Sequence, residues 1–324
     1  MVSTRHLPRG FFFLNSYSRL QFSYKGVIMR YMRYQTFIET VKEHIKQVLQ
    51  KQVYVHPVLK NNGAIYDGLV ILDPLHNISP TIYLNPYFHR YLDGVSMEDI
   101  YEDILHVYED NLPKEDFDIS VFQEYEKARE RIIMKLIHAE KNQQLLQQVP
   151  HIRIYDLAIV FLCNVNDYMN SYATILIYNQ HLKLWNVDSD DLYDAAKTNT
   201  LRMLPPRLDN LHDVFEHITN ESLDFLNELN ISILTNPLKL YGATCMVYPN
   251  LLGEIADIYE DDVIIIPSSV HEVLVFPSHN LPDGYTLDYL NTMIENVNET
   301  ELPDIEILSD HVYYYHRDTK EITY

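Results

Sequence analysis

Hydrophobic and polar residues follow two recurring patterns along the chain. Apolar side chains that recur every three or four positions predict amphipathic helices, and short runs of β-branched and aromatic residues predict strands. The predicted helices cover residues 33–51, 118–149, 188–197, 214–229, 251–260 and 287–297, and Ser96 caps one more. The predicted strands cover residues 53–59, 64–72, 78–84, 157–163, 173–178, 231–234, 240–248 and 312–315, with a further pair within 264–277.

The predicted strands come in neighbouring pairs, with helices between the pairs. The Asn62-Gly63 dipeptide is a strong signal for a hairpin turn, and the polar stretch 164–171 predicts another turn. This order predicts an α+β fold in which helices cover antiparallel sheets. The longest helical pattern, 118–149, ends at Pro150. Two α/β lobes joined by this helix, with an internal boundary near residue 150, are therefore an alternative arrangement.

The charge of the chain limits its binding partners. The formal net charge is −21 at pH 7, from 46 acidic and 25 basic residues, and six of the basic residues lie within 1–33, which contain no Asp or Glu. The rest of the chain repels phosphate and anionic lipid, so we expect neither nucleic-acid binding through a basic face nor membrane binding. The 26 tyrosines suit half-buried sheet faces and interfaces. We therefore expect a protein partner.

Residues 1–31 differ from the rest of the chain because they are basic, aromatic and without periodicity. They are interpreted either as a flexible arm or as a gene start assigned too far upstream. We prefer the second interpretation, because residues 25–27 can be encoded by a purine-rich ribosome-binding sequence. The translation start would then be Met29 or Met32 instead of Met1.

The cysteines and the lengths of the apolar runs predict a cytoplasmic protein. Cys163 and Cys245 each lie in an apolar run, and no secretion signal accompanies them, so both are expected to be buried and reduced. No apolar run approaches the roughly 20 residues that a membrane-spanning helix needs.

The segment 264–277, IIIPSSVHEVLVFP, combines a strongly apolar sequence with the side chains Ser268, Ser269, His271 and Glu272. A serine hydrolase needs a serine nucleophile, a histidine base and a carboxylate in line. If residues 270–276 form a strand, Ser269 and His271 share one face and Glu272 points to the other. The carboxylate of a triad would then have to come from elsewhere in the chain.

Two structural interpretations compete for the same segment. Ser269 and Glu272 fit a capping box that would start a helix at Val270. The β-branched flanks instead favour two strands joined by a kink at Pro267-Ser268-Ser269, with His271 hydrogen-bonded at the sheet edge. We favour this structural role. A hydrolase that uses Ser269 and His271 with a distant carboxylate remains the alternative.

Motifs for metal and cofactor binding are missing from the sequence. It contains no His-Glu-x-x-His, no Cys-x-x-Cys, no Walker motif and no dinucleotide fingerprint, so no metal or cofactor is expected. The acidic clusters within 98–118 fit the solvated outside of a helix better than a docking surface. The leading hypothesis is therefore a non-catalytic binding or regulatory protein.

Seven stretches of the chain resemble one of the large families of unknown function from anaerobic gut Firmicutes. They are LKNNGAIYDGLVI (59–71), NISPTIYLN (77–85), VPHIRIYDLAIVF (149–161), ATILIYNQHLKLW (173–185), GATCMVYPNLL (242–252), IIIPSSVHEVLVFP (264–277) and LSDHVYYY (308–315). The resemblance implies a single family-wide domain over 32–324, which makes a boundary near 150 internal, and it stops short of residues 1–31. The family has no established activity, so the resemblance implies no catalytic residue.

Overall fold

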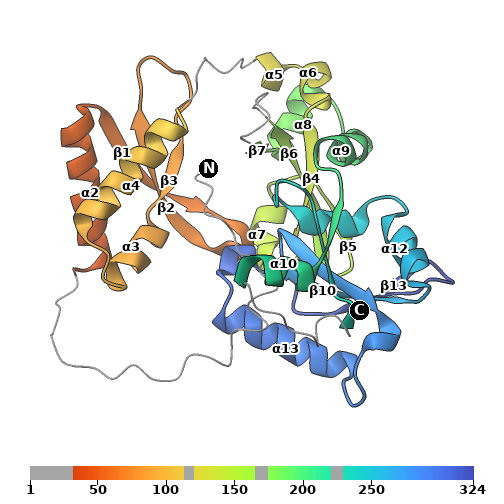
Figure 1. Ribbon diagram of the computed structural model, residues 1–324. Helices are drawn as coiled ribbons and strands as arrows, with labels where there is room; N and C mark the ends of the chain where they lie inside the picture. The colour runs from red at the N-terminus through yellow and green to blue at the C-terminus, as the bar shows by residue number, and fades with distance from the viewer. Residues whose placement is uncertain (1–31, 113–119, 165–173, 220–228) are drawn as a thin grey trace, which may run out of the picture. The chain divides into compact units, whose positions relative to one another are not determined.

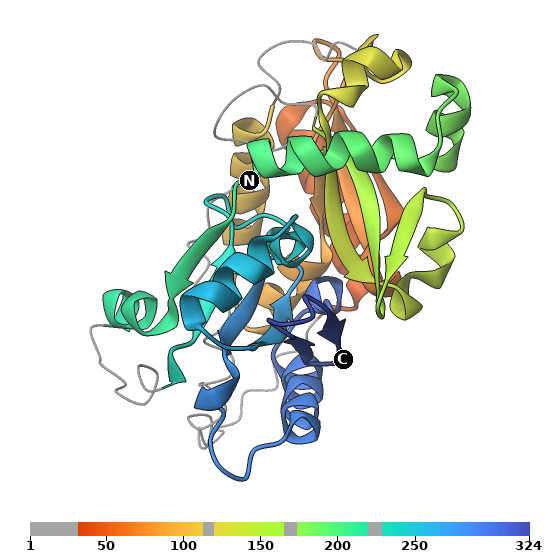
Figure 2. The ribbon, with the colours of Figure 1, turned by 90° about the vertical axis from the view of Figure 1, so that its right-hand side faces the viewer.

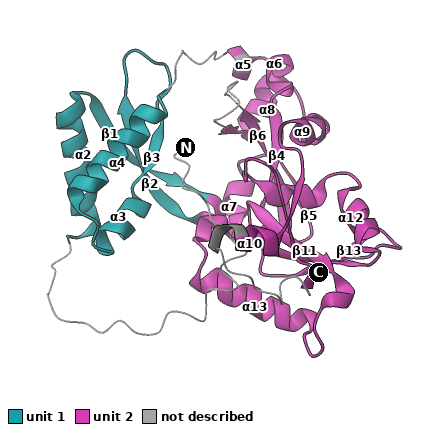
Figure 3. Cartoon of the chain, in the orientation of Figure 1, with its two compact units in different colours: residues 1–5, 20–60, 64–119 teal, residues 6–19, 61–63, 120–324 magenta. Residues whose placement is uncertain are grey.

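The computed structural model describes residues 32–112, 120–164, 174–219 and 229–324 (Figure 1). The chain divides into two compact units, and the second begins at residue 120 and also includes residues 61–63 (Figure 3). Residue 150 lies within the second unit, between the helix α7 (Gln143–Leu146) and the strand β5 (His151–Ile154). The extension 1–31, most of the predicted turn 164–171 and residues 220–228 of a predicted helix lie outside the described residues.

The first unit is a three-stranded antiparallel sheet with helices packed on one face. Its elements are α2 (Tyr34–Leu49), β1 (Gln52–Leu59), β2 (Ile65–Leu72), β3 (Thr81–Tyr83), α3 (Asn85–Leu92) and α4 (Met97–Asp110). The strand order is β1-β2-β3. The hairpin predicted at Asn62-Gly63 is confirmed, and the Ser96 side chain caps α4 by accepting a hydrogen bond from the Asp99 amide. These features were predictable because each depends on local sequence.

The core of the first unit lies between the two long helices and the sheet. Phe37, Val41 and Ile45 form one face of α2 and are fully buried. Leu69 and Ile71 of β2 meet them from the sheet. Burial of this apolar surface is the main stabilising contribution in the unit, at roughly 25 cal/mol for each Å² removed from water.

An ion pair at the rim of this core holds a carboxylate in its charged form. The Lys51 Nζ donates to Asp73 Oδ2 at 2.7 Å and to the Tyr108 hydroxyl at 3.0 Å. The Asp73 side chain is only 4% exposed. The hydrogen bond from Lys51, helped by the backbone amide of Leu75, lowers the pKa of Asp73 from 3.8 to about 2. The charged pair therefore stabilises the folded unit at neutral pH.

We predict that Lys51→Met makes the first unit unfold in acid at a higher pH. Because its folded pKa is depressed, Asp73 contributes stability above pH 3.8, and this contribution is lost as the pH falls towards 2. Without the ammonium group the carboxylate takes up a proton earlier. Hydrogen exchange of peptides from α2 and β2, followed during acid titration, measures the effect. Lys46→Met, which removes an exposed pair with Glu43 at 4.0 Å, is the control, and an equal acid midpoint in both variants would contradict the prediction.

The second unit contains two antiparallel sheets with helices around them. The first sheet consists of β4 (Ile132–His138), β5 (His151–Ile154), β6 (Leu157–Asn164) and β7 (Thr174–Leu176), with β6 in the centre. The second sheet has the order β13 (Ile322–Thr323), β12 (Tyr313–Tyr315), β10 (Val263–Ser269), β11 (Glu272–Pro277), β9 (Ser232–Thr235) and β8 (Arg207–Asn210). The α+β class with antiparallel sheets is confirmed.

Helices and short turns connect these strands. They are α5 (Ser120–Gln123), α6 (Tyr125–Arg129), α7 (Gln143–Leu146), α8 (Asn179–Trp185), α9 (Ser189–Met203), α10 (Leu211–Thr219), α12 (Leu251–Tyr259), α13 (Leu287–Thr300) and the 3₁₀ helices η3 (Glu140–Asn142), η4 (Gly242–Val247), η5 (Ser278–Asn280) and η6 (Asp304–Glu306). Figure 2 shows α9 lying across the sheet that contains β4 and β6. The predicted helices over 188–197, 251–260 and 287–297 correspond to α9, α12 and α13.

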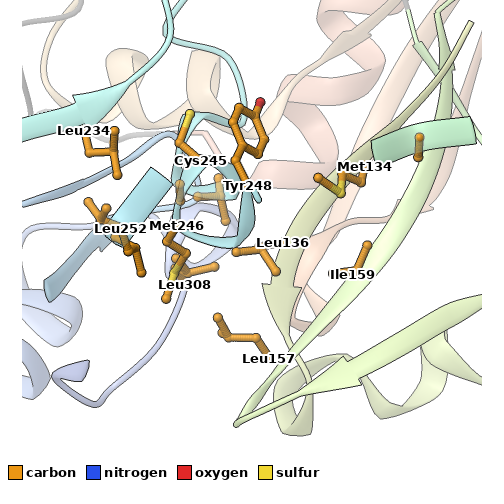
Figure 4. Packing of buried hydrophobic residues seen from close by; sticks show 14 of the residues in the cluster. Met134, Leu136, Leu157, Ile159, Leu234, Cys245, Met246, Tyr248, Leu252 and Leu308 are labelled. Atoms are coloured by element: carbon orange, nitrogen blue, oxygen red, sulfur yellow. The ribbon is translucent and has the colours of Figure 1, made fainter. Parts of the chain in front are cut away.

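One apolar cluster extends from the first sheet of this unit to the second. Leu136 and Ile159 come from β4 and β6, and Met246 and Leu252 come from η4 and α12 (Figure 4). Cys163 and Cys245 are free thiols, and both lie in this cluster, as the sequence predicts. Side chains of η4 therefore form part of the hydrophobic core between the two sheets.

The outer edge of β4 is closed by side chains in place of another strand. The amide of Met134 donates to Thr200 Oγ1 at 2.9 Å, and the amide of Leu136 donates to Thr244 Oγ1 at 3.2 Å. Asn199 Nδ2 donates to the carbonyl of Ile132 at 3.1 Å. A sheet edge with free donors and acceptors invites pairing with other chains, and these three side chains from α9 and η4 block that pairing.

The long helix predicted over 118–149 is wrong, and so is the bridge between two lobes that it suggested. The segment contains the short helices α5 and α6, the strand β4, and then η3 and α7. Every residue of β4 except Lys135 is buried. A strand that is buried on both faces has a continuous apolar sequence, and such a run also satisfies a spacing of three or four residues.

The strand predicted over 240–248 is also wrong. The structure has the 3₁₀ helix η4 there, preceded by Tyr241 in the left-handed region at φ 54°. The buried side chain of Asn236 organises the preceding loop, because its Oδ1 accepts from the Leu238 and Leu240 amides and its Nδ2 donates to the Leu240 carbonyl. These bonds turn the backbone away from an extended path.

Candidate functional site

The four candidate residues of the sequence analysis lie at the end of a buried β-hairpin. Ser269, the last residue of β10, pairs with Glu272, the first residue of β11, so Val270 and His271 form the turn. The register shifts between Ile266 and Ser269, where the sequence predicts a kink. The two strands are confirmed, but Pro267, Ser268 and Ser269 lie within β10, and the strands are joined at Val270 and His271 instead of at the predicted kink. Neither the helix start at Val270 nor a strand through His271 occurs, so the expectation that Ser269 and His271 share a strand face is wrong.

Ser269 is buried and its hydroxyl has a structural partner. The side chain is 0% exposed, and Oγ accepts a hydrogen bond from the His271 backbone amide at 3.1 Å. This bond, from a residue two positions on, is the usual way in which a serine stabilises a tight turn. A nucleophile has to reach the substrate, and a fully buried hydroxyl in this position does not.

His271 is held in one tautomer by a backbone group. Its Nδ1 accepts from the Tyr241 amide at 3.3 Å, so the proton of the neutral ring lies on Nε2. In a serine hydrolase triad the ring carries its proton on Nδ1 and accepts the serine proton at Nε2. The tautomer of His271 is the opposite one, and it makes the ring a donor at Nε2.

Residues from distant parts of the chain surround this histidine. The Tyr241 ring lies nearly parallel to the imidazole, with centroids 6.0 Å apart and an interplanar angle of 16°. Lys135 Nζ lies 4.8 Å from the centroid of the Tyr241 ring. Thr235 Oγ1 donates to the His271 carbonyl at 2.8 Å, and Gly242 packs against Thr235 and that carbonyl. No local motif predicts how Tyr241, Lys135 and Thr235 meet at this histidine, because the contacts Tyr241–His271, Lys135–Tyr241 and Thr235–His271 each join residues 30 or more positions apart.

Ser268 and Glu272 complete the candidate set and are both 3% exposed. The turn also packs on η6, because the Val270 amide donates to the Glu306 carbonyl at 2.9 Å. The hydrogen bonds of Ser269 and of the His271 backbone stabilise the hairpin turn. The arrangement is therefore a rigid support for one imidazole and lacks the Ser269–His271 side-chain bond of a triad.

A second polar cluster lies around residues 308–313 of the same unit. Asp310 accepts from Lys141 Nζ and Asn298 Nδ2, both at 2.8 Å, and His138 Nε2 is 3.7 Å from Asp310 Oδ2. The nearby His138 imidazole and the hydrogen bonds from Lys141 and Asn298 hold the pKa of Asp310 well below its usual range. The carboxylate is therefore charged, and it is hydrogen-bonded to η3 and α13, which is the arrangement of a structural anchor.

Asp156 anchors the same segment from the turn between β5 and β6. Its two carboxylate oxygens accept from Ser309 Oγ at 2.6 Å and from the Tyr313 hydroxyl at 2.5 Å. Burial, followed by the charge of Asp156, raises the pKa of Tyr313 well above its usual range. Tyr313 therefore remains a neutral donor, and its hydrogen bond secures β12.

The residues that the structure describes contain no group of three or more His, Cys, Asp or Glu side chains suited to hold a metal ion. Burial raises the pKa of both Cys163 and Cys245 to about 12, so their thiols stay protonated and are poor nucleophiles. Within the same described ranges, every helix is too short or too polar to cross a membrane.

One face of the sheet in the first unit carries an unusual set of side chains. Strand alternation and register place ten residues on the face opposite the helical core: Gln52, Tyr54, His56, Val58, Tyr66, Gly68, Val70, Leu72, Thr81 and Tyr83. We call this set the aromatic face. None of its ten residues is acidic. Tyr54 is 51% exposed and Leu72 is 43% exposed.

Contacts within the aromatic face order its rings. Tyr66 and Tyr83 meet edge to face with centroids 5.9 Å apart, and Lys60 Nζ lies 4.0 Å above the Tyr83 ring. Gly68, the cross-strand partner of Tyr83, leaves no room for a side chain, because a Cβ atom there would lie 2.7 Å from Thr81 Cγ2 and 3.1 Å from Val58 Cγ2. The result is a closely packed surface of tyrosine and β-branched residues. This surface could not be predicted from the sequence, because the three strands that form it meet only in the fold.

Comparison with known protein families shows that the model of a family of unknown function matches residues 34–317. No curated protein and no solved structure matches the chain.

Proposed function

We propose that this chain, which belongs to the family of unknown function DUF5688, binds a protein partner through the aromatic face of its first unit. We also propose that the protein acts in the cytoplasm, and that its source is a gut Firmicute, as the family resemblance implies. The proposal assigns no catalytic role to Ser268, Ser269, His271 or Glu272.

The composition of the aromatic face is the observation that carries this proposal. The chain has 46 acidic residues, and none of them lies among the ten positions of this face. Protein interfaces are depleted in acidic residues at their centre and enriched in tyrosine. Exposed apolar surface that is continuous over several residues is a common mark of a binding site. The 51% exposure of Tyr54 and the 43% exposure of Leu72 make these two residues the natural anchors.

The same face also indicates what kind of surface the partner offers. Valine and leucine side chains need an apolar counterpart, and the tyrosine rings add apolar area with a polar tip. Within the face the Tyr54 hydroxyl donates to Gln52 Oε1 at 2.9 Å. The side chain of Lys60 adds a positive charge beside the aromatic face, and the imidazole of His56 adds a polar group within it. A partner with an apolar centre and carbonyl or carboxylate groups around it matches these features.

We predict that a photo-crosslinking amino acid at Tyr54 captures a specific protein in cells of the source organism. Benzoylphenylalanine replaces Tyr54 in the full-length chain, and irradiated cells are analysed by gel shift and mass spectrometry. The expected result is one dominant adduct heavier than the chain. The same adduct should weaken at least about fivefold when Leu72→Asp is added, since a buried interfacial charge costs well over 1 kcal/mol.

Benzoylphenylalanine at Ile258 provides the matched control. Ile258 is 70% exposed on α12 of the second unit, outside the aromatic face. The proposal fails if both positions yield the same adducts, or if Tyr54 crosslinks only within its own chain.

A further inference from the structure

We propose that the hydrogen bond between the Tyr241 amide and His271 Nδ1 is a pH-sensitive latch, closed while the imidazole is neutral and opened by its protonation. The latch joins the β10–β11 turn to segment 236–242. It lies in the second unit and does not rest on the proposed binding function.

The position of the ring proton makes the contact sensitive to pH. Nδ1 accepts the Tyr241 N–H at 3.3 Å, so the neutral ring already carries its proton on Nε2. A second proton can enter only at Nδ1. There it would face the Tyr241 N–H, and two donors would oppose each other where one hydrogen bond existed before. The closed arrangement therefore excludes the imidazolium form.

The surroundings decide which side of the latch moves. The backbone of His271 is fixed on both sides, because its amide donates to Ser269 Oγ and its carbonyl accepts from Thr235 Oγ1. Tyr241 has φ 54°, a conformation that is costly for a residue with a side chain and persists only where neighbouring contacts enforce it. When the ring is protonated, we expect the strained Tyr241 to leave and the turn to stay.

The charged groups near the β10–β11 turn have opposite effects on the protonation of His271. Lys135 lies over the Tyr241 ring and adds positive charge on that side. Glu272 begins β11, and Glu306 belongs to η6, whose backbone carbonyl binds the Val270 amide. Negative charge close to a histidine favours its protonated form, so a carboxylate beside the ring would move opening towards neutral pH. It would not change which ring nitrogen takes the second proton, so the direction of the effect stays the same.

The sign of the pH dependence follows from linkage. An exposed imidazole takes up a proton near pH 6.5, and the closed latch does not. The open form therefore binds one proton more, so the closed state is favoured at high pH. Below about pH 6.5 the ratio of open to closed molecules rises about tenfold for each pH unit.

Hydrogen exchange of the full chain tests the proposal. Peptides that cover 236–242 are followed by mass spectrometry at pH 7.5 and pH 5.5, with intrinsic exchange rates corrected for pH. In the wild type we expect protection of this segment to fall about tenfold at pH 5.5. In His271→Asn the amide oxygen occupies the place of Nδ1 and does not titrate, so protection should change less than about twofold.

His271→Gln completes the design, because its amide oxygen lies at the place of Nε2 and cannot accept from Tyr241. This variant should lack protection of 236–242 at both pH values while β10 and β11 peptides stay protected. The latch is disproved if the wild type and His271→Asn show the same pH profile. It is equally disproved if His271→Asn is as unprotected at pH 7.5 as His271→Gln.

Discussion

Gly242→Ala is expected to destabilise the second unit by about 3 kcal/mol, at the upper end of what overpacking costs. An added Cβ would overlap Thr235 Oγ1 and the His271 carbonyl oxygen, and it would lie 2.9 Å from Thr235 Cα. Two of these three atoms are backbone, so they cannot move away as the end of a side chain would. The hairpin turn or η4 must therefore shift, and the buried contacts of Thr235 and Cys245 are disturbed with it.

Thermal unfolding measures this effect. For a unit of roughly 200 residues a loss of 3 kcal/mol lowers the melting temperature by about 6–12 °C. Gly253→Ala is the control, because Gly253 lies in α12 and its added Cβ would meet only the Tyr315 hydroxyl, at 3.1 Å. Alanine favours a helix by up to about 1 kcal/mol over glycine, which offsets this tight contact. Equal melting temperatures for the two variants would show that the backbone around Gly242 is not rigid.

The double variant Thr200→Val, Thr244→Val is expected to cost about 2–6 kcal/mol, because each change leaves one buried amide of β4 without an acceptor. Valine has nearly the shape of threonine, so packing is retained and the hydroxyl is the main loss. Thr200 Oγ1 also donates to the Ala196 carbonyl at 2.6 Å, so its removal affects α9 as well. Thr200 is 0% exposed and Thr244 is 1% exposed, so water cannot replace either hydroxyl without opening the structure.

Chemical denaturation of the single and double variants tests this edge. Thr198→Val, an exposed position on α9, is the matched control and should change the free energy of unfolding by less than about 0.5 kcal/mol. Turbidity measured on mild heating gives a second readout, because an unsatisfied strand edge promotes association between chains. If both buried changes are as small as the control, the threonine hydroxyls do not close the edge.

The elements predicted from the sequence are those that neighbouring residues decide. The helix over 33–51, the Asn62-Gly63 hairpin and the Ser96 cap all depend on residues within a few positions of one another, and each is found in the structure. The strand β4 was missed because burial on both faces removes the alternation that marks a half-buried strand. The segment 240–248 was missed because a single buried side chain, Asn236, turns it away from an extended path.

The candidate site was also predicted only in part, because some of its contacts are local and others join distant residues. The sequence places Ser269, His271 and Glu272 at a kink between two strands, and the structure has a hairpin turn there. The state of the His271 ring depends on Tyr241, 30 residues away, and the ring of Tyr241 in turn meets Lys135. Such contacts are set by the packing of two sheets, and no local spacing encodes them.

The closure of β4 by threonine hydroxyls has a consequence for the newly made chain. The acceptors for the Met134 and Leu136 amides follow 66 and 108 residues later in the sequence. At a synthesis rate of about 5–20 residues per second, Thr244 is added roughly 5–20 s after Leu136. During this interval β4 can already pair with β6, yet its other edge is open to any extended segment nearby. The nascent protein is therefore most in need of a chaperone after β6 has left the ribosome and before η4 has done so.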